Sequence, residues 1–262
     1  MRIGLRYEER EGVGLMRVPA FEELGGVDCA ITTRVGGVSA GECRWLNMSR
    51  KRADPLETVE ENIRRVCRAM GVERERMIFT PQNHGIRMRF ATEADAGLGM
   101  TRPMEEPLDA LLTDVPGLVL TKHVADCVPV LLYAPGRACA AIHAGWRGTA
   151  AGIAGLAVRA MCGRYGLSPA QIYGAVGPSI GPCCFEVGPE VAEAFPNHVV
   201  EGMGKPHVNL WRANADQLRA AGVPENQITV AEVCTCCQEN LFYSHRRDHG
   251  RTGSMAALIA LR

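Results

Sequence analysis

The chain has 262 residues, of which 47% are hydrophobic and 22% charged, as is ordinary for a soluble globular protein. Lys and Arg total 29 and Asp and Glu total 29, so nothing in the net charge indicates binding to nucleic acid or to an anionic membrane. Residues 1–10 lack the apolar core of a signal peptide, and no apolar run approaches the roughly 20 residues of a membrane span. Without an export signal, eleven cysteines favour thiols or metal ligands over disulfides, and we expect a cytoplasmic protein.

The first half of the chain predicts short strands separated by glycine-containing loops. Strands are expected at residues 12–18, 27–33 and 77–80. The loop after the second strand carries Arg34 beside two glycines, and the backbone amides of such a loop can hold an anion. An ordinary turn is the alternative.

The clearest helix is predicted after Asp54. Asp54 is the expected N-cap, with Pro55 at the first helical position and Glu57 at the third. Apolar residues then recur at helical spacing before a terminating glycine, namely Val59, Ile63, Val66, Met70 and Gly71.

A β-hairpin is predicted around Pro135-Gly136, between apolar runs at residues 128–134 and 138–144. Cys127 and His143 each lie eight residues from Pro135, so antiparallel pairing would set them nearly opposite each other. Opposed side chains have Cβ atoms about 4.5–5.5 Å apart, and a thiolate and an imidazole at that spacing can share one Zn²⁺. The alternative is a buried cysteine and a strand-end histidine without a metal.

A second helix is predicted at residues 149–165, directly after Trp146-Arg147-Gly148. Its N-terminal N–H groups would face the proposed metal, and Arg147 would add a positive charge there. The alternative is an ordinary amphipathic helix with Arg147 on its surface.

The C-terminal third predicts strands at residues 172–176 and 228–230, helices at residues 189–195 and 209–221, and a small-residue helix from Ser254. No repeat, low-complexity tract or Ser/Gly linker interrupts the chain, so residues 1–262 are expected to form one domain.

Five cysteines cluster in this third of the chain. Cys183 and Cys184 are adjacent, and Cys234-x-Cys236-Cys237 is not interpreted as the C-x₂-C pair of structural zinc sites. We therefore expect buried or adventitious thiols here and no zinc ribbon.

Five motifs occur together and in order: Q-N-H-G at 82–85, A-D-C-V-P-V-L-L at 125–132, H-A-G-W-R-G at 143–148, G-P-S-I-G-P-C-C-F-E-V-G at 177–188 and S-H-R-R-D-x-G-x-T-G at 244–253. This combination resembles the laccase-domain family, the multicopper polyphenol oxidase or YfiH/YlmD-type purine nucleoside phosphorylases. The resemblance implies a single-domain α+β fold, with mixed sheets covered by helices in α/β/β/α layers. It also implies one zinc held by His84, Cys127 and His143. Ser254 departs from the family, which often has Arg at that position.

The resemblance implies two reactions. One is phosphorolysis of adenosine, inosine or methylthioadenosine to the base and ribose 1-phosphate, and the other is deamination of adenosine. Two histidines and one cysteine leave a coordination position open, as in catalytic zinc sites. The expected ligands are a small-molecule nucleoside and phosphate, with no nucleic acid or membrane, and the expected state is a monomer or dimer.

Other residues are candidates for the chemistry around the zinc. Arg147, Arg34 and Arg246, in that order, are candidates for phosphate binding, and Asp126 for orienting a histidine ligand. Asn47 and Gln82 are candidate polar contacts to the sugar or base, with ordinary loop hydrogen bonding as the alternative.

Three other functions are alternatives to this one. Multicopper oxidation needs a further cluster of histidines, which seven scattered histidines do not supply, although one Cu could occupy the same three ligands in vitro. A zinc amidase acting on peptidoglycan precursors is the alternative enzyme. A non-catalytic zinc- or thiol-binding partner protein would have the fourth position closed by Cys184 or His123.

Overall fold

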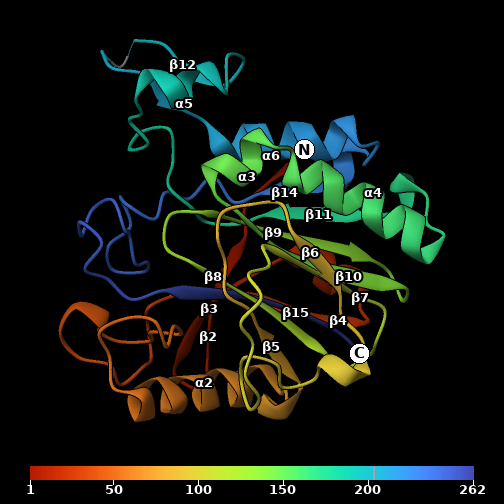
Figure 1. The fold of residues 1–262 in the computed structure, drawn as a ribbon, viewed down its shortest axis with the longest axis vertical. Coiled ribbons are helices and arrows are strands. Elements are labelled where there is room, and N and C mark those ends of the chain that lie inside the picture. The colour runs from red at the N-terminus through yellow and green to blue at the C-terminus, as the bar shows by residue number, and fades with distance from the viewer. Residues whose placement is uncertain (203) are drawn as a thin grey trace.

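Two β-sheets packed face to face, each covered by helices on its outer side, form the four layers of the computed structural model (Figure 1). The structure describes residues 1–202 and 204–262. One hydrophobic cluster lies between the two sheets, and a further cluster lies between each sheet and its helices. This arrangement confirms the expected layered α+β fold.

The first sheet has seven strands. Their order is β1 (Arg2–Ile3), β14 (Ile228–Val230), β11 (Tyr173–Val176), β9 (Val128–Ala134), β10 (Ala138–Ala144), β7 (Ala110–Thr113) and β6 (Met88–Phe90). Helices α4 (Ile153–Tyr165) and α6 (Leu210–Ala220) bury their apolar sides against this sheet.

The second sheet has six strands. Their order is β2 (Arg6–Arg10), β3 (Val13–Arg17), β4 (Val27–Thr32), β15 (Met255–Leu261), β8 (Val119–Val124) and β5 (Met77–Phe79). Helix α2 (Leu56–Met70) covers its outer face. The strands predicted at residues 12–18, 27–33 and 77–80 are thereby confirmed within a residue at each end.

Short elements complete the chain. They are the helices α1 (Pro19–Leu24), α3 (Trp146–Ala150) and α5 (Pro189–Glu193), the two-stranded pair β12 (Val199–Val200) and β13 (His207–Val208), and the 3₁₀ turns η1 (Gly41–Cys43), η2 (Arg74–Arg76), η3 (Glu93–Asp95), η4 (Pro169–Gln171) and η5 (Glu225–Gln227). No helix among the described residues has the length and apolarity that crossing a membrane requires.

The predicted hairpin is confirmed in its strands but not in its register. Strands β9 and β10 have the expected bounds, yet His143 pairs with Pro129 and Ala144 with Val128. The turn is centred on Gly136 and not on Pro135, so Cys127 lies beyond the last pair and not opposite His143. Cys127 therefore approaches the histidine from the loop that precedes β9.

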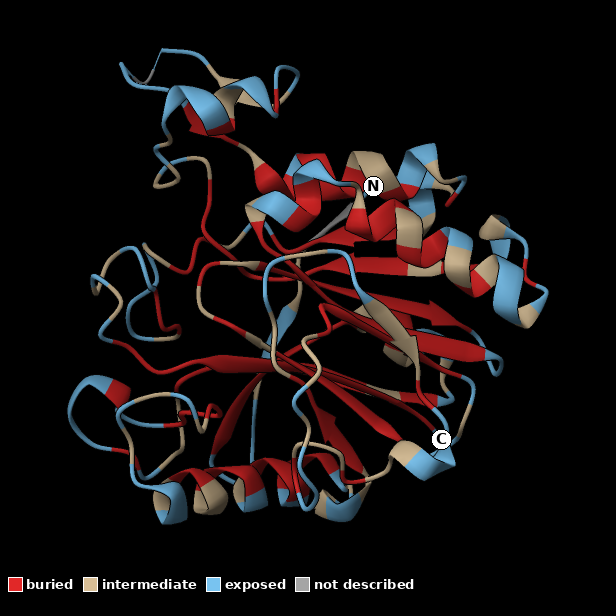
Figure 2. Ribbon diagram, viewed as in Figure 1, coloured by how far each residue is buried: buried red, intermediate tan, exposed pale blue. Residues whose placement is uncertain are grey.

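Of the predicted helices, the one from Ser254 was wrong and the one at residues 149–165 was wrong in part. The helix expected from Ser254 is instead strand β15 (Met255–Leu261), because a short, continuously apolar run suits a strand buried on both faces as well as a helix. Figure 2 shows the central strands buried along their length. The helix expected at 149–165 is two helices, α3 and α4, separated by Gly152, whose φ of 82° belongs to the left-handed region.

The predicted helix after Asp54 is confirmed as α2, but its N-cap is not Asp54. Pro55 holds the N-cap position, and Gly71 with φ 66° ends the helix as expected. The Asp54 carboxylate instead accepts hydrogen bonds from Ser39 and Asn47, which ties down the preceding loop.

Candidate metal centre and active-site cavity

Three ligand-type side chains from separate segments meet at one end of β10. The ligand atoms of His84, Cys127 and His143 all lie within 4.8 Å of one another. His84 follows β5, Cys127 precedes β9 and His143 lies in β10. The two imidazole rings meet edge to face, with centroids 4.8 Å apart. Two imidazoles and a thiol are a donor set typical of Zn²⁺ and Cu²⁺ sites.

The carboxylate of Asp109 organises this group. Backbone N–H groups of three successive residues point at it, with N···O distances of 3.4 Å for Asn83, 3.1 Å for His84 and 2.9 Å for Gly85. The same carboxylate lies 2.8 Å from Nδ1 of His143. One buried side chain thus fixes both the loop that carries His84 and the ring of His143.

This contact sets which nitrogen of His143 can bind a metal. Burial opposes ionisation of Asp109, but the hydrogen bond from His143 and the amides of Gly85 and Asn83 lower the pKa of Asp109 overall. The ionised carboxylate only accepts hydrogen bonds, so Nδ1 of His143 carries the proton. Nε2 keeps its lone pair for a cation, and burial lowers the pKa of His143, which favours this neutral form.

Backbone geometry lets His84 approach the other two ligands. His84 has φ 62°, in the left-handed region, and the amide contacts of Asn83, His84 and Gly85 to Asp109 hold the loop in that conformation. A Cβ atom on Gly145 would lie 2.6 Å from Cδ2 of the His84 ring. Glycine is therefore required in the H-A-G-W-R-G motif at the position that faces the ring.

The thiol of Cys127 is poorly suited to ionise on its own. Burial, together with the nearby carboxylates of Asp126 and Asp109, raises the pKa of Cys127 to about 12. A thiolate at neutral pH therefore needs a cation beside it, and the ligand atoms of the two histidines mark where a cation would lie.

A cavity of about 620 Å³ opens beside the three ligands, and all three line it. This volume falls in the range of small-molecule binding sites. Three aromatic side chains line its walls, namely Phe79, Trp146 and Phe185. Three consecutive basic residues also line it, namely Arg50, Lys51 and Arg52.

Three of the remaining candidate residues line this cavity. The amide of Gln82 exchanges two 2.9 Å hydrogen bonds with the backbone of His123. Asp126 does not orient a histidine, contrary to expectation. Its carboxylate accepts from Thr235, Ser244 and the amide of Arg246. Asp126 thus holds the loop that brings Arg246 to the cavity.

The other three candidates do not line the cavity. The guanidinium of Arg34 is buried and donates to the carbonyls of Arg44 and Glu239, so its role is structural. Asn47 is fully buried and bonds Ser49, Asp54 and Ser254. Arg147 is exposed, and its guanidinium lies 4.1 Å from the centre of the Trp146 ring.

Neither proposed closing ligand belongs to the three-residue group. The ring of His123 lies 2.9 Å from the carbonyl of Met48 and stacks near Phe79, and Cys184 lies in a separate group of sulfurs. Among the described residues, the group of His84, Cys127 and His143 has no fourth His, Cys, Asp or Glu. This leaves room for a substrate or solvent atom, as in catalytic sites.

A positively charged side chain from another part of the chain lies beside Ser254. Nε of Arg52 donates to Oγ of Ser254 at 3.2 Å, and both residues line the cavity. A guanidinium thus lies next to the position where the family often has arginine.

Sequence reasoning missed Asp109 and Lys122. Asp109 directly precedes β7, whose pairing of Ala110 with Ile142 brings Asp109 beside His143. Lys122 lies on β8 and is fully buried, and its ammonium group donates to Thr80 and to the carbonyl of Leu108. Burial lowers the pKa of Lys122 to about 7, against an opposing effect of the Asp109 charge.

Replacement of Lys122 should remove a pH dependence of stability. Between pH about 7 and 10.5 the unfolded chain carries a Lys122 proton that the folded chain lacks, so the free energy of unfolding rises with pH. For a single group this rise is at most about 1.4 kcal/mol per pH unit. In Lys122→Met the rise between pH 7 and pH 9 in urea unfolding should be smaller by that contribution. Lys51→Met, at an exposed position, is the control, and equal slopes in the two variants would contradict the prediction.

The chain is similar to known proteins in both sequence and structure. The family model for multi-copper polyphenol oxidoreductase laccase matches residues 28–262. Purine nucleoside phosphorylase YlmD of Geobacillus stearothermophilus is 39% identical over 266 residues, which cover 97% of this chain and 97% of that protein. Adenosine deaminase RL5 of an unknown prokaryotic organism is 38% identical over 198 residues, which cover 70% of this chain and 75% of that protein. The crystal structure of YlmD from Geobacillus stearothermophilus matches with a TM-score of 0.91 and 38% identity, over 98% of each chain.

Proposed function

The chain belongs to the multi-copper polyphenol oxidoreductase laccase family, and from that premise we propose that it is a zinc-dependent purine nucleoside phosphorylase. Its proposed substrates are adenosine, inosine or methylthioadenosine with phosphate, and its products are the base and ribose 1-phosphate. Deamination of adenosine is proposed as a second activity of the same site. Relatives named for each reaction support the pairing.

The observation that carries the proposal is a three-donor group in the wall of a cavity of nucleoside size. His84, Cys127 and His143 fit zinc because two neutral imidazoles and one thiolate are borderline-soft donors. A zinc ion bound there would supply a Lewis acid with an open coordination position.

The chain's own residues would position the substrate. Asp109 holds the proton on Nδ1 of His143 and so keeps Nε2 free. Trp146 and Phe185 offer flat apolar surfaces to a purine ring. Arg52, Lys51 and Arg246 line the cavity and supply positive charge for a phosphate dianion.

Multicopper oxidation is not supported by the geometry. Such chemistry requires a cluster of several histidines in addition to a His₂Cys site. The part of the chain that the structure describes holds two groups of at least three residues that could bind a metal, and the second group consists of cysteines alone.

A cytoplasmic location remains a prediction.

The function is tested by incubation of adenosine with and without phosphate, followed by chromatographic analysis of the products. With phosphate we expect adenine and ribose 1-phosphate, and without phosphate mainly inosine. Both activities should fall together in His143→Ala, because both use the same cavity. His198→Ala is the matched control, since His198 pairs with Asp216 and does not line the cavity. Unchanged product yields in His143→Ala would refute the shared site.

A second experiment identifies the arginine that binds phosphate. Of the three arginines singled out from the sequence, Arg246 lines the cavity, whereas Arg147 and Arg34 do not. Loss of a charge-assisted hydrogen bond costs about 1.5–3 kcal/mol, so Arg246→Ala should raise KM for phosphate about tenfold or more. Arg147→Ala should leave it near the wild-type value. A larger effect in Arg147→Ala would restore the original assignment of phosphate binding to that residue.

A further inference from the structure

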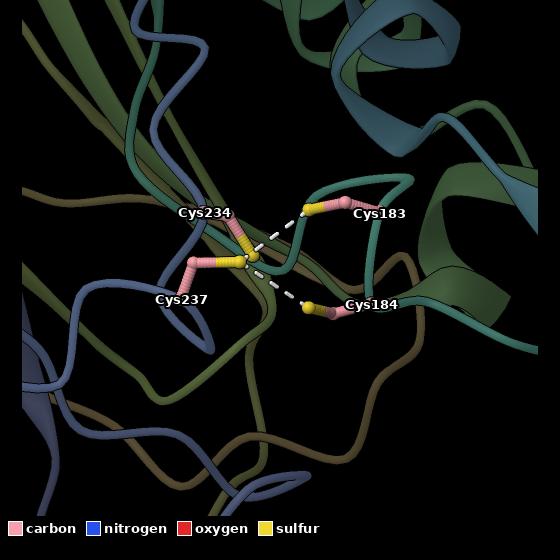
Figure 3. A group of neighbouring side chains, drawn as sticks. All are labelled: Cys183, Cys184, Cys234 and Cys237. Atoms are coloured by element: carbon pink, nitrogen blue, oxygen red, sulfur yellow. Dashed lines mark hydrogen bonds between the residues drawn. The ribbon is translucent and has the colours of Figure 1, made fainter.

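Four cysteines from two distant segments converge outside the cavity. The sulfur atoms of Cys183, Cys184, Cys234 and Cys237 all lie within 4.8 Å of one another (Figure 3). The sequence predicted buried or adventitious thiols here and no C-x₂-C pair. The second part was wrong, because Cys234 and Cys237 are separated by two residues and have that spacing.

The sheet explains why the two cysteine pairs meet. Strands β11 and β14 are parallel neighbours, so their carboxyl ends lie at the same edge. The chain continues from β11 to Cys183 and Cys184, and from β14 to Cys234 and Cys237. Backbone hydrogen bonds between the two loops fix their register, with Ser179 N to Val233 O at 3.2 Å and Thr235 N to Ser179 O at 3.0 Å.

We propose that these four cysteines bind a second zinc ion in a tetrathiolate site. A tetrahedral ion with Zn–S distances of about 2.3 Å sets its sulfurs about 3.8 Å apart. The sulfur of Cys237 lies 3.4 Å from that of Cys184 and 3.6 Å from that of Cys183. Both distances are well beyond the S–S bond of about 2.0 Å in a disulfide.

Contacts around the sulfurs suit thiolates. The amide N–H of Gly181 points at the sulfur of Cys234 at 3.2 Å, and such a bond stabilises negative charge on sulfur. Four thiolates and one Zn²⁺ carry a net charge of about −2, and Arg246 offsets part of it by donating to the carbonyl of Cys184 at 3.1 Å.

The site would act on the cavity through its wall. The two loops that it joins supply Ile180, Phe185, His245 and Arg246 to the cavity lining. A zinc ion between the loops would hold these residues in place without contacting the substrate. It is a closed structural site, distinct from the three-ligand group with its open position.

Metal counting on the full-length protein tests the proposal. Zinc-loaded wild-type chain should hold about two ions by elemental analysis, and the double variant Cys183→Ser/Cys237→Ser about one. Cys127→Ala should also fall to about one, yet its Co²⁺ form should keep the absorption bands of a four-thiolate site. Cys162→Ser, a half-buried cysteine on α4 outside the group, is the control and should keep both ions.

A measurement on the unaltered chain guards against a variant that fails to fold. In apo-protein, alkylation followed by peptide mass mapping should modify the exposed Cys183 and Cys237, and Zn²⁺ should protect both. Equal modification with and without Zn²⁺ would overturn the proposal. So would an intact mass lower by two hydrogens, restored by reductant, in a chain that takes up no second ion. Neither result bears on the nucleoside reaction, whose test uses other residues.

Discussion

Cys127→Ala should lose the ion of the three-ligand group and, with it, both nucleoside activities. The substitution removes the only anionic donor among three ligands, and two neutral imidazoles hold a divalent cation much less tightly. We expect bound zinc to fall by about one ion per chain, and turnover of adenosine to fall at least about a hundredfold, with or without phosphate.

The change at Cys127 must be separated from a loss of folding. Cys127 is the last residue of the loop before β9 and makes no part of a strand. The Cys127→Ala variant should therefore still fold. Far-ultraviolet circular dichroism and urea unfolding of the metal-free proteins should therefore nearly coincide for wild type and variant. Cys139→Ala is a useful contrast, because Cys139 is buried between the sheets and should affect stability without affecting zinc. Full zinc occupancy in Cys127→Ala, with activity intact, would refute the ligand assignment.

Local patterns in the sequence were enough to predict the elements that frame the site. Strands β9 and β10 lie on either side of a Pro-Gly turn, and α2 has a helical repeat of apolar residues, so each is specified by its own residues. Strand β15 was mistaken for a helix because its side chains are buried on both faces, which removes the alternation typical of strands. Its partners β4 and β8 are more than a hundred residues away in the chain, and no local pattern reveals them.

The candidate site was predicted unevenly for the same reason. Cys127 and His143 were placed together from the hairpin, even though the register was off by two residues. His84 could be assigned as the third ligand only from the resemblance to a family. It follows β5, a strand of the second sheet, and lies outside the hairpin that carries Cys127 and His143. Asp109 was missed and Asp126 chosen instead, since adjacency to Cys127 in sequence is visible whereas pairing of β7 with β10 is not.

Asp109→Asn tests whether this missed carboxylate positions the ligands. The asparagine side chain has the same shape but only one acceptor oxygen, and its NH₂ group would face N–H donors. It cannot serve the amides of His84 and Gly85 and Nδ1 of His143 together, as the carboxylate does. Loss of the bond would also let the proton of His143 move to Nε2, which removes the lone pair that Nε2 offers to a metal.

The expected result is a zinc affinity weaker by about 10- to 100-fold, which is the usual cost of losing a carboxylate partner of a metal-binding histidine. Competition with a chelator measures this directly, without reference to activity. Excess zinc should restore much of the turnover in Asp109→Asn but none in Cys127→Ala, because the first variant keeps all three ligand atoms and the second does not. Asp114→Asn is the control, an exposed carboxylate just beyond β7. If Asp109→Asn binds zinc as tightly as wild type, Asp109 supports the fold of the loop alone, and the tautomer of His143 is fixed by other contacts.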